Sequence, residues 1–469
     1  MKVEVVSREI LKPSSPTPTH LKSYNLSLLD QVSPPFHVPL ILYYQINDSD
    51  ASSSKSVRVL CDLLKRSFAE ALTIYYPFAG RVNENMIVDC NDDGIDYSEA
   101  KVSHCRLQKF IQESNIVELE KPFLPFNPSD GNNSDALLAV QVNVFEECGG
   151  IALGLCFSHK VADASSFTAF VTHWAAIARG TPEQVEVPVF KLSSLFPPKD
   201  VLKNLVSPAS YSKEEMVTKK FVLEPSIIDE LKRKAVIGST STNGESYSIA
   251  QEHKPVTRIE AVSAFLWKCF IDMDLSKNKG VPFKVYTASY SVNMRSKIVP
   301  PLPSNSIGNM QTITAAVSMF TSDTEKDQYT NLVGKVKNAI RMIDGGHVKE
   351  LQTTDALLNN MELMKEQISS GQRVNMHFNS WLGNSLHKTD FGWGKPALMS
   401  ICKLAFKNLV FLLDKSSGDG GIEAWVSLSK EDMTIFEHNE ELKTGLSPPL
   451  PPSSDPSKSR SRTSLLARI

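Results

Sequence analysis

Residues 138–163, LAVQVNVFEECGGIALGLCFSHKVAD, decide the fold of the middle of this chain. Every second residue of Leu138–Val144 is apolar, the next few residues turn the chain, and the alternation resumes over Ile151–Phe157. A period of two is typical of strands with one buried face, so the pattern predicts a half-buried β-hairpin. Apolar residues at helical spacing follow and end at Gly180. The pattern therefore places His159 where a strand gives way to a helix.

Composition limits the possible functions of the whole chain. With 469 residues, 41% of them hydrophobic and 22% charged, it is too long for one ordinary core. A net charge of −2 argues against a nucleic-acid partner. No apolar run reaches the roughly 18 residues of a membrane span, and the first residues lack the apolar run of a signal peptide. We therefore expect a cytoplasmic protein without a membrane partner.

The seven cysteines are scattered and form no C-x-x-C motif. This pattern predicts reduced thiols rather than a disulfide framework or a zinc site. No metal is therefore predicted.

A proline-rich stretch separates two globular regions of the chain. Both alternate strand-like and helix-like segments. The Pro-rich stretch 181–218 has little periodicity and is interpreted as a long crossover between an N-terminal domain, residues 1–180, and a C-terminal domain, residues 219–446. Residues 447–469 are mostly Ser, Pro, Lys and Arg and cannot bury enough apolar surface to offset chain entropy. We expect this tail to be disordered.

His159 is the first candidate catalytic residue. A neutral imidazole takes up a proton near pH 7, and a general base placed against an alcohol contributes roughly 10²–10⁴-fold to the rate. Asp163 has three possible roles at this stage: it hydrogen-bonds the imidazole, it caps the helix that starts at Ala164, or it anchors an arginine. A metal site is not favoured, because no further ligand is evident at a suitable spacing.

A second candidate segment lies far downstream. Asn379-Ser380-Trp381 is followed by Asp390-Phe391-Gly392-Trp393-Gly394-Lys395-Pro396. The glycines allow backbone conformations closed to other residues, while two aromatic side chains hold the loop in place. We interpret the segment as a clamp. A packed turn without chemistry is an equally good interpretation of Asp390.

Together these segments resemble the plant acyl-CoA-dependent acyltransferases called the BAHD family, which carry H-x-x-x-D near the middle and D-F-G-W-G toward the C-terminus. The resemblance covers nearly the whole chain. It includes Lys12-Pro13-Ser14-Ser15-Pro16-Thr17-Pro18, Leu26-Ser27-Leu28-Leu29-Asp30-Gln31, Tyr76-Pro77-Phe78-Ala79-Gly80-Arg81, Val292-Asn293-Met294-Arg295 and Pro300-Pro301-Leu302-Pro303. The opening and Val88-Asp89-Cys90-Asn91-Asp92 resemble the alkaloid branch.

The resemblance implies two similar α/β domains of the chloramphenicol acetyltransferase type, with a segment near 370–395 swapped into the N-terminal domain. A channel between the domains would bring acyl-CoA and an alcohol to His159 from opposite sides. His159 would deprotonate the hydroxyl, and the acyl group would pass directly to it in a ternary complex. The resemblance also implies a monomer.

Further roles follow only from the resemblance. Asp163 would point away from the substrates and pair with Arg295 as structural support. Trp381 would lie near the oxyanion of the tetrahedral intermediate, and its indole N–H suits such a charge. Asn379 departs from the Thr or Ser that the family often has there. Asp390 is the last candidate catalytic residue, although its loop is better suited to domain packing or to the CoA entrance.

Candidate binding residues complete the predicted site. Ser263, Asn379 and Ser380 are predicted to lie along acyl-CoA, although a helix serine such as Ser263 also bonds its own backbone. Phe36 and Val38 are predicted to line the pocket of the alcohol, and core packing explains them equally well.

The substrates are predicted from the resemblance. Ser306-Ile307-Gly308-Asn309-Met310 lacks the Tyr-Phe-Gly-Asn-Cys pattern of the anthocyanin malonyltransferase branch, which favours acetyl-CoA as the donor. An alkaloid alcohol is the first expected acceptor, with acyl-sugars or volatile alcohols as the alternative. A serine hydrolase using Ser158 is disfavoured because no G-x-S-x-G motif occurs. A catalytically silent binding protein with this fold remains a further alternative.

Overall fold

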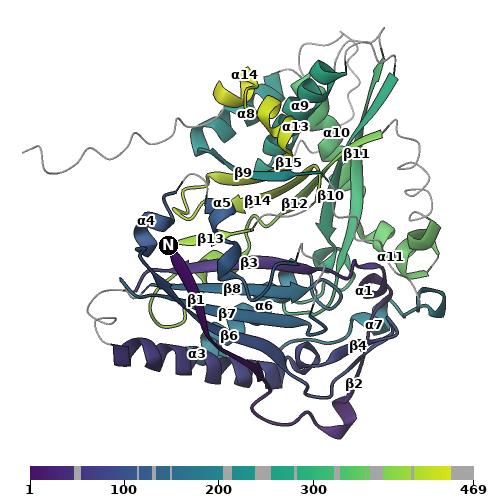
Figure 1. The fold of residues 1–469 in the computed structure, drawn as a ribbon. Coiled ribbons are helices and arrows are strands. Elements are labelled where there is room, and N and C mark those ends of the chain that lie inside the picture. The colour runs from purple at the N-terminus through teal and green to yellow at the C-terminus, as the bar shows by residue number, and fades with distance from the viewer. Residues whose placement is uncertain are drawn as a thin grey trace, which may run out of the picture.

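The computed structural model describes residues 1–46, 54–113, 116–128, 134–147, 150–203, 214–237, 255–278, 283–321, 328–353, 355–359, 373–402 and 406–444. The predicted disordered tail at 447–469 lies outside the described residues. Within them the α/β prediction is confirmed, because two sheets of six strands each carry helices on their outer faces (Figure 1).

The first sheet and its helices come mainly from the N-terminal half. Its strands, in spatial order, are β1 (Lys2–Leu11), β6 (Ile95–Ser103), β7 (Leu138–Phe145), β8 (Ile151–Ser158), β3 (His37–Tyr44) and β13 (Leu398–Ser400). The helices of this half are α1 (Leu28–Val32), α3 (Ser54–Ile74), α4 (Leu107–Phe110), α5 (Ile116–Leu119), α6 (Ala164–Ala178) and α7 (Leu192–Leu195). A small sheet, β2 (Ser23–Asn25), β5 (Ile87–Asp89) and β4 (Arg81–Asn83), lies beside it.

The second sheet comes from the C-terminal half. Its strands, in spatial order, are β11 (Gln311–Thr321), β10 (Phe283–Asn293), β12 (Arg373–Ser380), β14 (Leu409–Asp414), β15 (Ile422–Ser429) and β9 (Met216–Leu223). Its helices are α8 (Pro225–Ile237), α9 (Arg258–Lys277), α10 (Tyr329–Arg341), α11 (Gly345–Thr353), α13 (Lys430–Phe436) and α14 (Glu440–Thr444). Figure 1 shows α3 beneath the first sheet and α8, α9 and α13 above the second, with both sheets between these helices.

The predicted hairpin is confirmed as β7 and β8, which pair antiparallel. The expectation that it is half-buried is wrong, because every residue of both strands is buried. Its polar residues are satisfied inside the protein: Asn143 Nδ2 donates to the Phe123 carbonyl at 2.8 Å, and Gln141 Nε2 donates to the Pro122 carbonyl at 2.8 Å. A short helical turn at Lys121–Phe123 therefore covers the face that alternation alone would leave to water.

Gly154 makes this close cover possible. A Cβ at position 154 would lie 2.0 Å from the Phe123 carbonyl oxygen, closer than any non-bonded contact allows. Only glycine lets the covering turn approach strand β8 so closely. The alternating apolar pattern thus predicts the two strands of the hairpin correctly. Whether one or both faces of the hairpin are buried depends on a segment about 30 residues upstream.

The connections between the domains differ from the prediction at one point. Strand β12 lies in the second sheet, so the segment near 370–395 is not swapped into the first domain as a whole. The part that crosses over begins after β12: Trp381 and Phe391 join the first hydrophobic core, and Leu398–Ser400 pairs with β3.

The crossover 181–218 contains part of β9, which begins at Met216. Its described residues between 181 and 203 form short helical turns, and Leu192, Phe196 and Leu202 pack in a third cluster with Leu28 and Met294. This cluster holds residues from both halves of the chain together.

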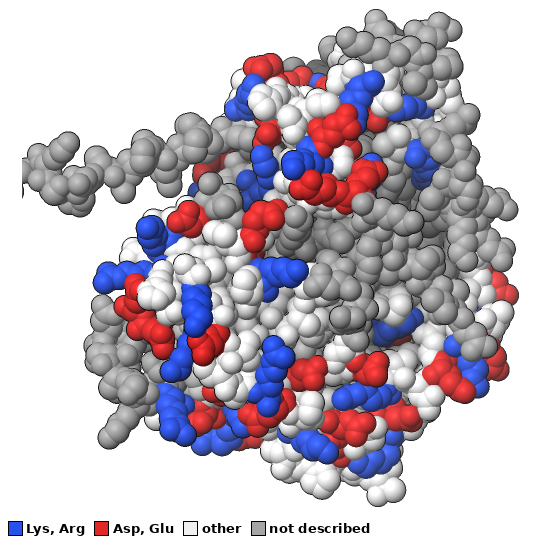
Figure 2. All heavy atoms as spheres, in the orientation of Figure 1, with Lys and Arg blue, Asp and Glu red and all other residues white. Residues whose placement is uncertain are grey.

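The visible surface carries both signs of charge. Figure 2 shows Lys and Arg side chains interspersed with Asp and Glu side chains over both domains on this face. Among the described residues, no helix is both long and apolar enough to cross a membrane.

Candidate active site

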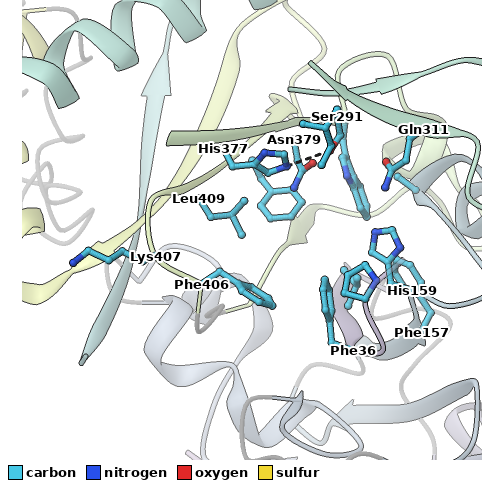
Figure 3. A pocket seen from close by; sticks show the side chains of 16 residues that line it. Phe36, Phe157, His159, Ser291, Gln311, His377, Asn379, Phe406, Lys407 and Leu409 are labelled. Carbon is cyan, nitrogen blue, oxygen red and sulfur yellow. Dashed lines mark hydrogen bonds between the residues drawn. The ribbon is translucent and has the colours of Figure 1, made fainter. Parts of the chain in front are cut away.

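His159 directly follows strand β8, as the sequence predicts. Its backbone N–H donates to the Phe36 carbonyl at 2.9 Å, which extends the pairing of β8 with β3 by one residue. The Phe36 ring meets the imidazole edge-on, with ring centroids 5.5 Å apart. The imidazole is half-buried and lines a cavity of about 360 Å³ between the two sheets (Figure 3). The structure therefore offers the ring to a ligand rather than sealing it in the core.

The protein interior favours the neutral form of His159. Burial lowers the pKa of His159 below its ordinary value of 6.5, with smaller opposing contributions that include Asp163 and the Asn309 side chain. Nδ1 is buried and has no hydrogen-bond partner among the described residues. Asn309 Nδ2 donates to the His159 carbonyl at 2.7 Å and so fixes the backbone that carries the ring. A neutral imidazole is the form that accepts a proton.

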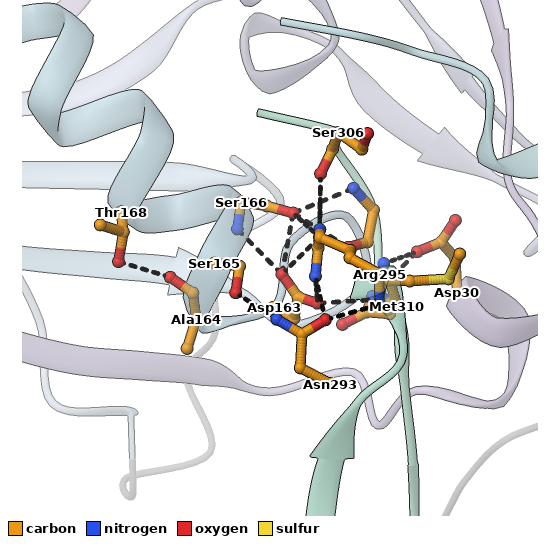
Figure 4. A network of polar contacts seen from close by, with 12 residues as sticks. Asp30, Asp163, Ala164, Ser165, Ser166, Thr168, Asn293, Arg295, Ser306 and Met310 are labelled. Atoms are coloured by element: carbon orange, nitrogen blue, oxygen red, sulfur yellow. Dashed lines mark hydrogen bonds and ion pairs between the residues drawn. The ribbon is translucent and has the colours of Figure 1, made fainter. Parts of the chain in front are cut away.

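Asp163 combines two of the three roles that the sequence leaves open. Its Oδ1 accepts from the backbone N–H of Ser166 at 2.9 Å, so it caps helix α6. It also forms a buried ion pair with Arg295, which donates to both carboxylate oxygens at 2.6 and 2.9 Å (Figure 4). Burial would raise the pKa of Asp163, but the Arg295 charge outweighs it and holds this pKa below its ordinary value. The predicted pairing is confirmed.

Arg295 links the loop of His159 and Asp163 to the second domain. Besides Asp163 it donates to the carbonyls of Ser306, at 2.9 Å, and Gly308, at 3.0 Å. The Met310 backbone N–H donates to Asp163 at 3.0 Å from the same loop. Figure 4 shows these residues converging between α6 and the strands of the second domain. With these partners, the Asp163 carboxylate and the Arg295 guanidinium form a buried network in which both charged groups are hydrogen-bonded.

A second buried carboxylate, Asp30, supports the other side of His159. Asn309 donates to Asp30 Oδ1 with its backbone N–H at 2.8 Å and with its side chain at 2.9 Å. Lys160 Nζ donates to the carbonyls of Asp30 and Gln31, at 3.3 and 2.8 Å. Sequence reasoning quoted Asp30 and Asn309 only as motif letters and assigned no role to them. Asp30 and Asn309 themselves lie 279 residues apart in the chain.

The cavity brings together half of the ten predicted site residues. Its described lining includes five of the predicted residues: Phe36, Val38, His159, Asn379 and Trp381. Its apolar lining also includes Phe157, Phe406 and Phe411. Phe36, Val38 and His159 come from the N-terminal half, whereas Asn379 lies on β12 and Trp381 directly follows that strand. The site is therefore assembled from both domains.

A second cavity of about 310 Å³ adjoins the first and is more polar. Asn379 and Trp381 line both cavities, and Ser380 lines the second one. Its described lining also includes Asp163, Ser165, Asn293, Gly383 and Asn384. The two cavities share a boundary beside Ala164, at the start of α6, close to His159.

Ser263 lies elsewhere. It is completely buried in helix α9, where its hydroxyl donates to the Ile259 carbonyl and accepts from Tyr290 at 3.1 Å. It lines neither cavity. The geometry matches the helix-serine interpretation and gives no support to its predicted contact with acyl-CoA.

Asp390 organises its own loop. Its Oδ1 accepts from the backbone N–H groups of Gly392 and Gly394, at 2.8 and 2.9 Å, and both glycines have positive φ. Arg179, just after α6, donates to the Asp390 carbonyl. Asp390 lines neither cavity, whereas Phe391 packs against the buried Trp174 of α6 at 4.6 Å between centroids. The loop therefore clamps the chain against the first domain.

Sequence reasoning missed the polar lining residues Ser291, Gln311 and His377. No motif marks them, because each is one alternating residue of an otherwise ordinary strand. Among the described residues no cluster of three or more His, Cys, Asp or Glu side chains is arranged to hold a metal.

Comparisons with known proteins identify the family of the chain. A family model described as the Transferase family matches residues 1–443. Stemmadenine O-acetyltransferase from Catharanthus roseus is 37% identical over 92% of this chain and 96% of its own. Limonoid 1-O-acetyltransferase from Citrus sinensis is 34% identical over 94% and 97% of the two chains.

Solved structures agree with the fold. The crystal structure of vinorine synthase has a TM-score of 0.76 and 32% identity, covering 95% of this chain and 98% of that chain. TRI101 of F. sporotrichioides complexed with coenzyme A and T-2 has a TM-score of 0.67 at 18% identity, which supports the fold alone.

The fold and the site thus define an acyl-CoA-dependent acyltransferase built of two chloramphenicol-acetyltransferase-like domains. The chain belongs to the Transferase family, the plant BAHD acyltransferases, as its motifs predict.

Proposed function

We propose that this protein transfers an acetyl group from acetyl-CoA to a hydroxyl of a polycyclic plant metabolite, with an alkaloid alcohol as the first candidate acceptor. The observation that carries the proposal is the half-buried imidazole of His159 in the apolar cavity, which shares Ala164 and Trp381 with the adjoining polar cavity. The donor and the acceptor class rest on the similarity to stemmadenine O-acetyltransferase, which covers nearly the full length of both chains.

The two cavities suit two different substrates. The apolar cavity, with its aromatic side chains, favours a hydrophobic acceptor skeleton. The polar cavity, lined by Asn379 and Ser380, favours the amide-containing arm of acyl-CoA. His159 lies where a thioester from one cavity and a hydroxyl from the other would meet. Holding both substrates in one site supplies the entropic part of catalysis.

In the proposed mechanism, Nε2 of His159 takes the hydroxyl proton as the alcohol oxygen bonds to the thioester carbonyl carbon. The carbonyl oxygen gains the negative charge, which the Trp381 indole N–H stabilises. The intermediate then collapses, the carbon–sulfur bond breaks, and the imidazolium returns the proton to the CoA thiolate. Asp163 and Arg295 hold the loop through their buried ion pair.

A limonoid-type triterpenoid alcohol is the second candidate acceptor. The limonoid 1-O-acetyltransferase relative covers as much of this chain as the alkaloid relative and has a similar identity. Both classes are rigid polycyclic alcohols, which an apolar cavity accommodates equally well.

A labelling screen tests the proposal. Purified protein is incubated with labelled acetyl-CoA and plant metabolite pools rich in alkaloids or in triterpenoids, and mass spectrometry identifies compounds that gain an acetyl group. His159→Ala should lose transfer by at least about 100-fold while melting at the wild-type temperature. His20→Ala, which changes an exposed histidine, is the matched control. Near wild-type transfer by His159→Ala would overturn the assignment.

A further inference from the structure

The second sheet contributes a patch of uncharged polar side chains to the apolar cavity. We call this patch the polar ledge; it consists of Ser291 on β10, Gln311 on β11, and His377 and Asn379 on β12. Figure 3 shows the ledge across the cavity from His159, Phe36 and Phe157, which come from the first domain. His159 and the ledge therefore face the cavity from opposite walls, and Ser291, Gln311 and Asn379 also line the polar cavity.

A chain of hydrogen bonds stabilises the ledge from behind. Strands β10 and β12 are parallel neighbours, with Ser289 directly opposite His377. His377 Nδ1 bonds Ser289 Oγ at 2.8 Å, and Nε2 bonds Ser291 Oγ at 3.2 Å. Ser289 is buried, whereas Ser291 lines both cavities. The chain thus starts in the protein interior and ends on a hydroxyl that faces the ligand space.

The His377 imidazole in this chain of hydrogen bonds is uncharged. Burial lowers the pKa of His377 to about 4, so one ring nitrogen carries a proton and the other does not at neutral pH. If Nε2 is protonated, it donates to Ser291 and leaves the Ser291 O–H free to donate to a ligand. If Nε2 is bare, it accepts from Ser291 and leaves the Ser291 oxygen free to accept. In both cases Ser291 keeps hydrogen-bonding capacity for one group in the cavity.

The remaining ledge residues extend this capacity. Gln311 and Asn379 each place an amide on the cavity wall, with both donors and an acceptor. Neither residue brings a charge. The facing wall of Phe36, Val38 and Phe157 offers no side-chain hydrogen bond. A ligand that matches both walls has an apolar body and one uncharged polar group at the end away from His159.

We propose that the polar ledge binds a second, uncharged oxygen function of the acceptor, a hydroxyl or a carbonyl, and thereby selects polycyclic alcohols that carry oxygen at both ends. This inference rests on the proposed function and deepens it by naming the acceptor class. Ser291 is then a binding residue, and His377 is a positioning residue that acts through it.

A pair of rigid probes tests the ledge by binding alone. Androstanol and epiandrosterone share a four-ring skeleton and a hydroxyl at one end, and they differ by the ketone at the far end. Their dissociation constants are measured on the full chain through tryptophan fluorescence, because Trp381 lines the cavity. Wild-type protein should bind epiandrosterone about fivefold more tightly, which is the effect of one additional neutral hydrogen bond.

Variants locate the origin of that preference. Ser291→Ala should lose most of it, and the double variant Ser291→Ala, Gln311→Leu should lose all of it, while androstanol binding changes by less than about twofold. Thr287→Val is the matched control, because Thr287 lies on the same strand, bonds Asn375 at 2.7 Å and does not line the cavity. Thermal melting checks that each variant is folded.

Three outcomes would overturn the inference: equal binding of the two probes by wild-type protein, a preference that survives in the double variant, or no binding of either probe. These outcomes are independent of acetyl transfer. Should His159→Ala and wild-type protein show the same probe preference while the labelling screen yields no acetylated product, the proposed function fails and the ledge remains.

Discussion

Arg295 and Asp163 lie 132 residues apart in the sequence, yet two nitrogens of the guanidinium donate to the two oxygens of the carboxylate at 2.6 and 2.9 Å. Both residues are about 95% buried. The same carboxylate caps the helix that follows His159. One buried pair therefore fixes the position of the His159 loop relative to the second domain.

Arg295→Ala should cost about 3–5 kcal/mol of unfolding free energy, because it leaves the Asp163 charge buried without its partner. Activity should fall with the lost structure. Chemical denaturation measures the change, and Lys297→Ala, in the same helical turn but exposed, is the control. An equally stable and active Arg295→Ala protein would contradict the structural role of the pair.

The acidic limb of the pH–rate profile should report the protonation of His159. Because burial lowers its pKa, the neutral base persists at lower pH than an ordinary histidine allows. We expect kcat/KM to fall to half its plateau below pH 6.5, with the protein still folded by circular dichroism. A limb centred above that pH would show that the charged imidazole is stabilised rather than destabilised by its surroundings.

Trp381→Phe should lower kcat by about 100-fold and leave the KM for acetyl-CoA nearly unchanged, because the indole N–H is lost while a ring still packs against Phe411. Steady-state kinetics with saturating acceptor separates the two constants. Trp393→Phe is the matched control, since Trp393 belongs to the clamp loop and lines neither cavity. Unchanged kcat in Trp381→Phe would remove the indole from the mechanism.

Asp390→Ala should cost about 1–2 kcal/mol of stability, because the backbone N–H groups of Gly392 and Gly394 lose their acceptor. Asp390→Asn keeps an oxygen in that place and should restore most of the stability. Thermal melts and kcat are measured together. If both variants lost activity while melting like wild type, the carboxylate would have a chemical role that the geometry does not indicate.

Stability should also depend on Glu120, which is fully buried and accepts from Tyr43 at 2.9 Å and from Ser400 at 2.6 Å. Burial raises its pKa from 4.5 to about 7. The folded state therefore holds this proton where the unfolded state has released it, so the contribution is complete below pH 4.5 and is lost as the pH rises toward 7.

Glu120→Gln removes that titration. The variant should show a flatter dependence of unfolding free energy on pH between 4.5 and 7, by roughly 3 kcal/mol in total. Denaturation at several pH values measures both proteins side by side. Parallel curves for the two proteins would mean that Glu120 ionises normally in the fold.

The sequence by itself determined the local elements and the chemistry of the loop. Alternating apolar residues predicted β7 and β8, helical spacing predicted α6, and His159 followed from its place between them. These features depend on neighbours within a few residues, and periodicity records such contacts directly. The motifs His159–Asp163 and Asp390–Gly394 carried the family assignment, which the comparisons confirmed.

Only the tertiary structure decided which distant residues meet. The covering turn at Phe123 buried a hairpin that alternation had left half exposed, and β12 remained in the second sheet although the clamp loop crossed to the first. Asn309, Ser291 and His377 reached the site from strands and loops without a distinctive pattern. Their roles arise from pairings across more than 80 residues, and such pairings leave no periodic trace in one sequence.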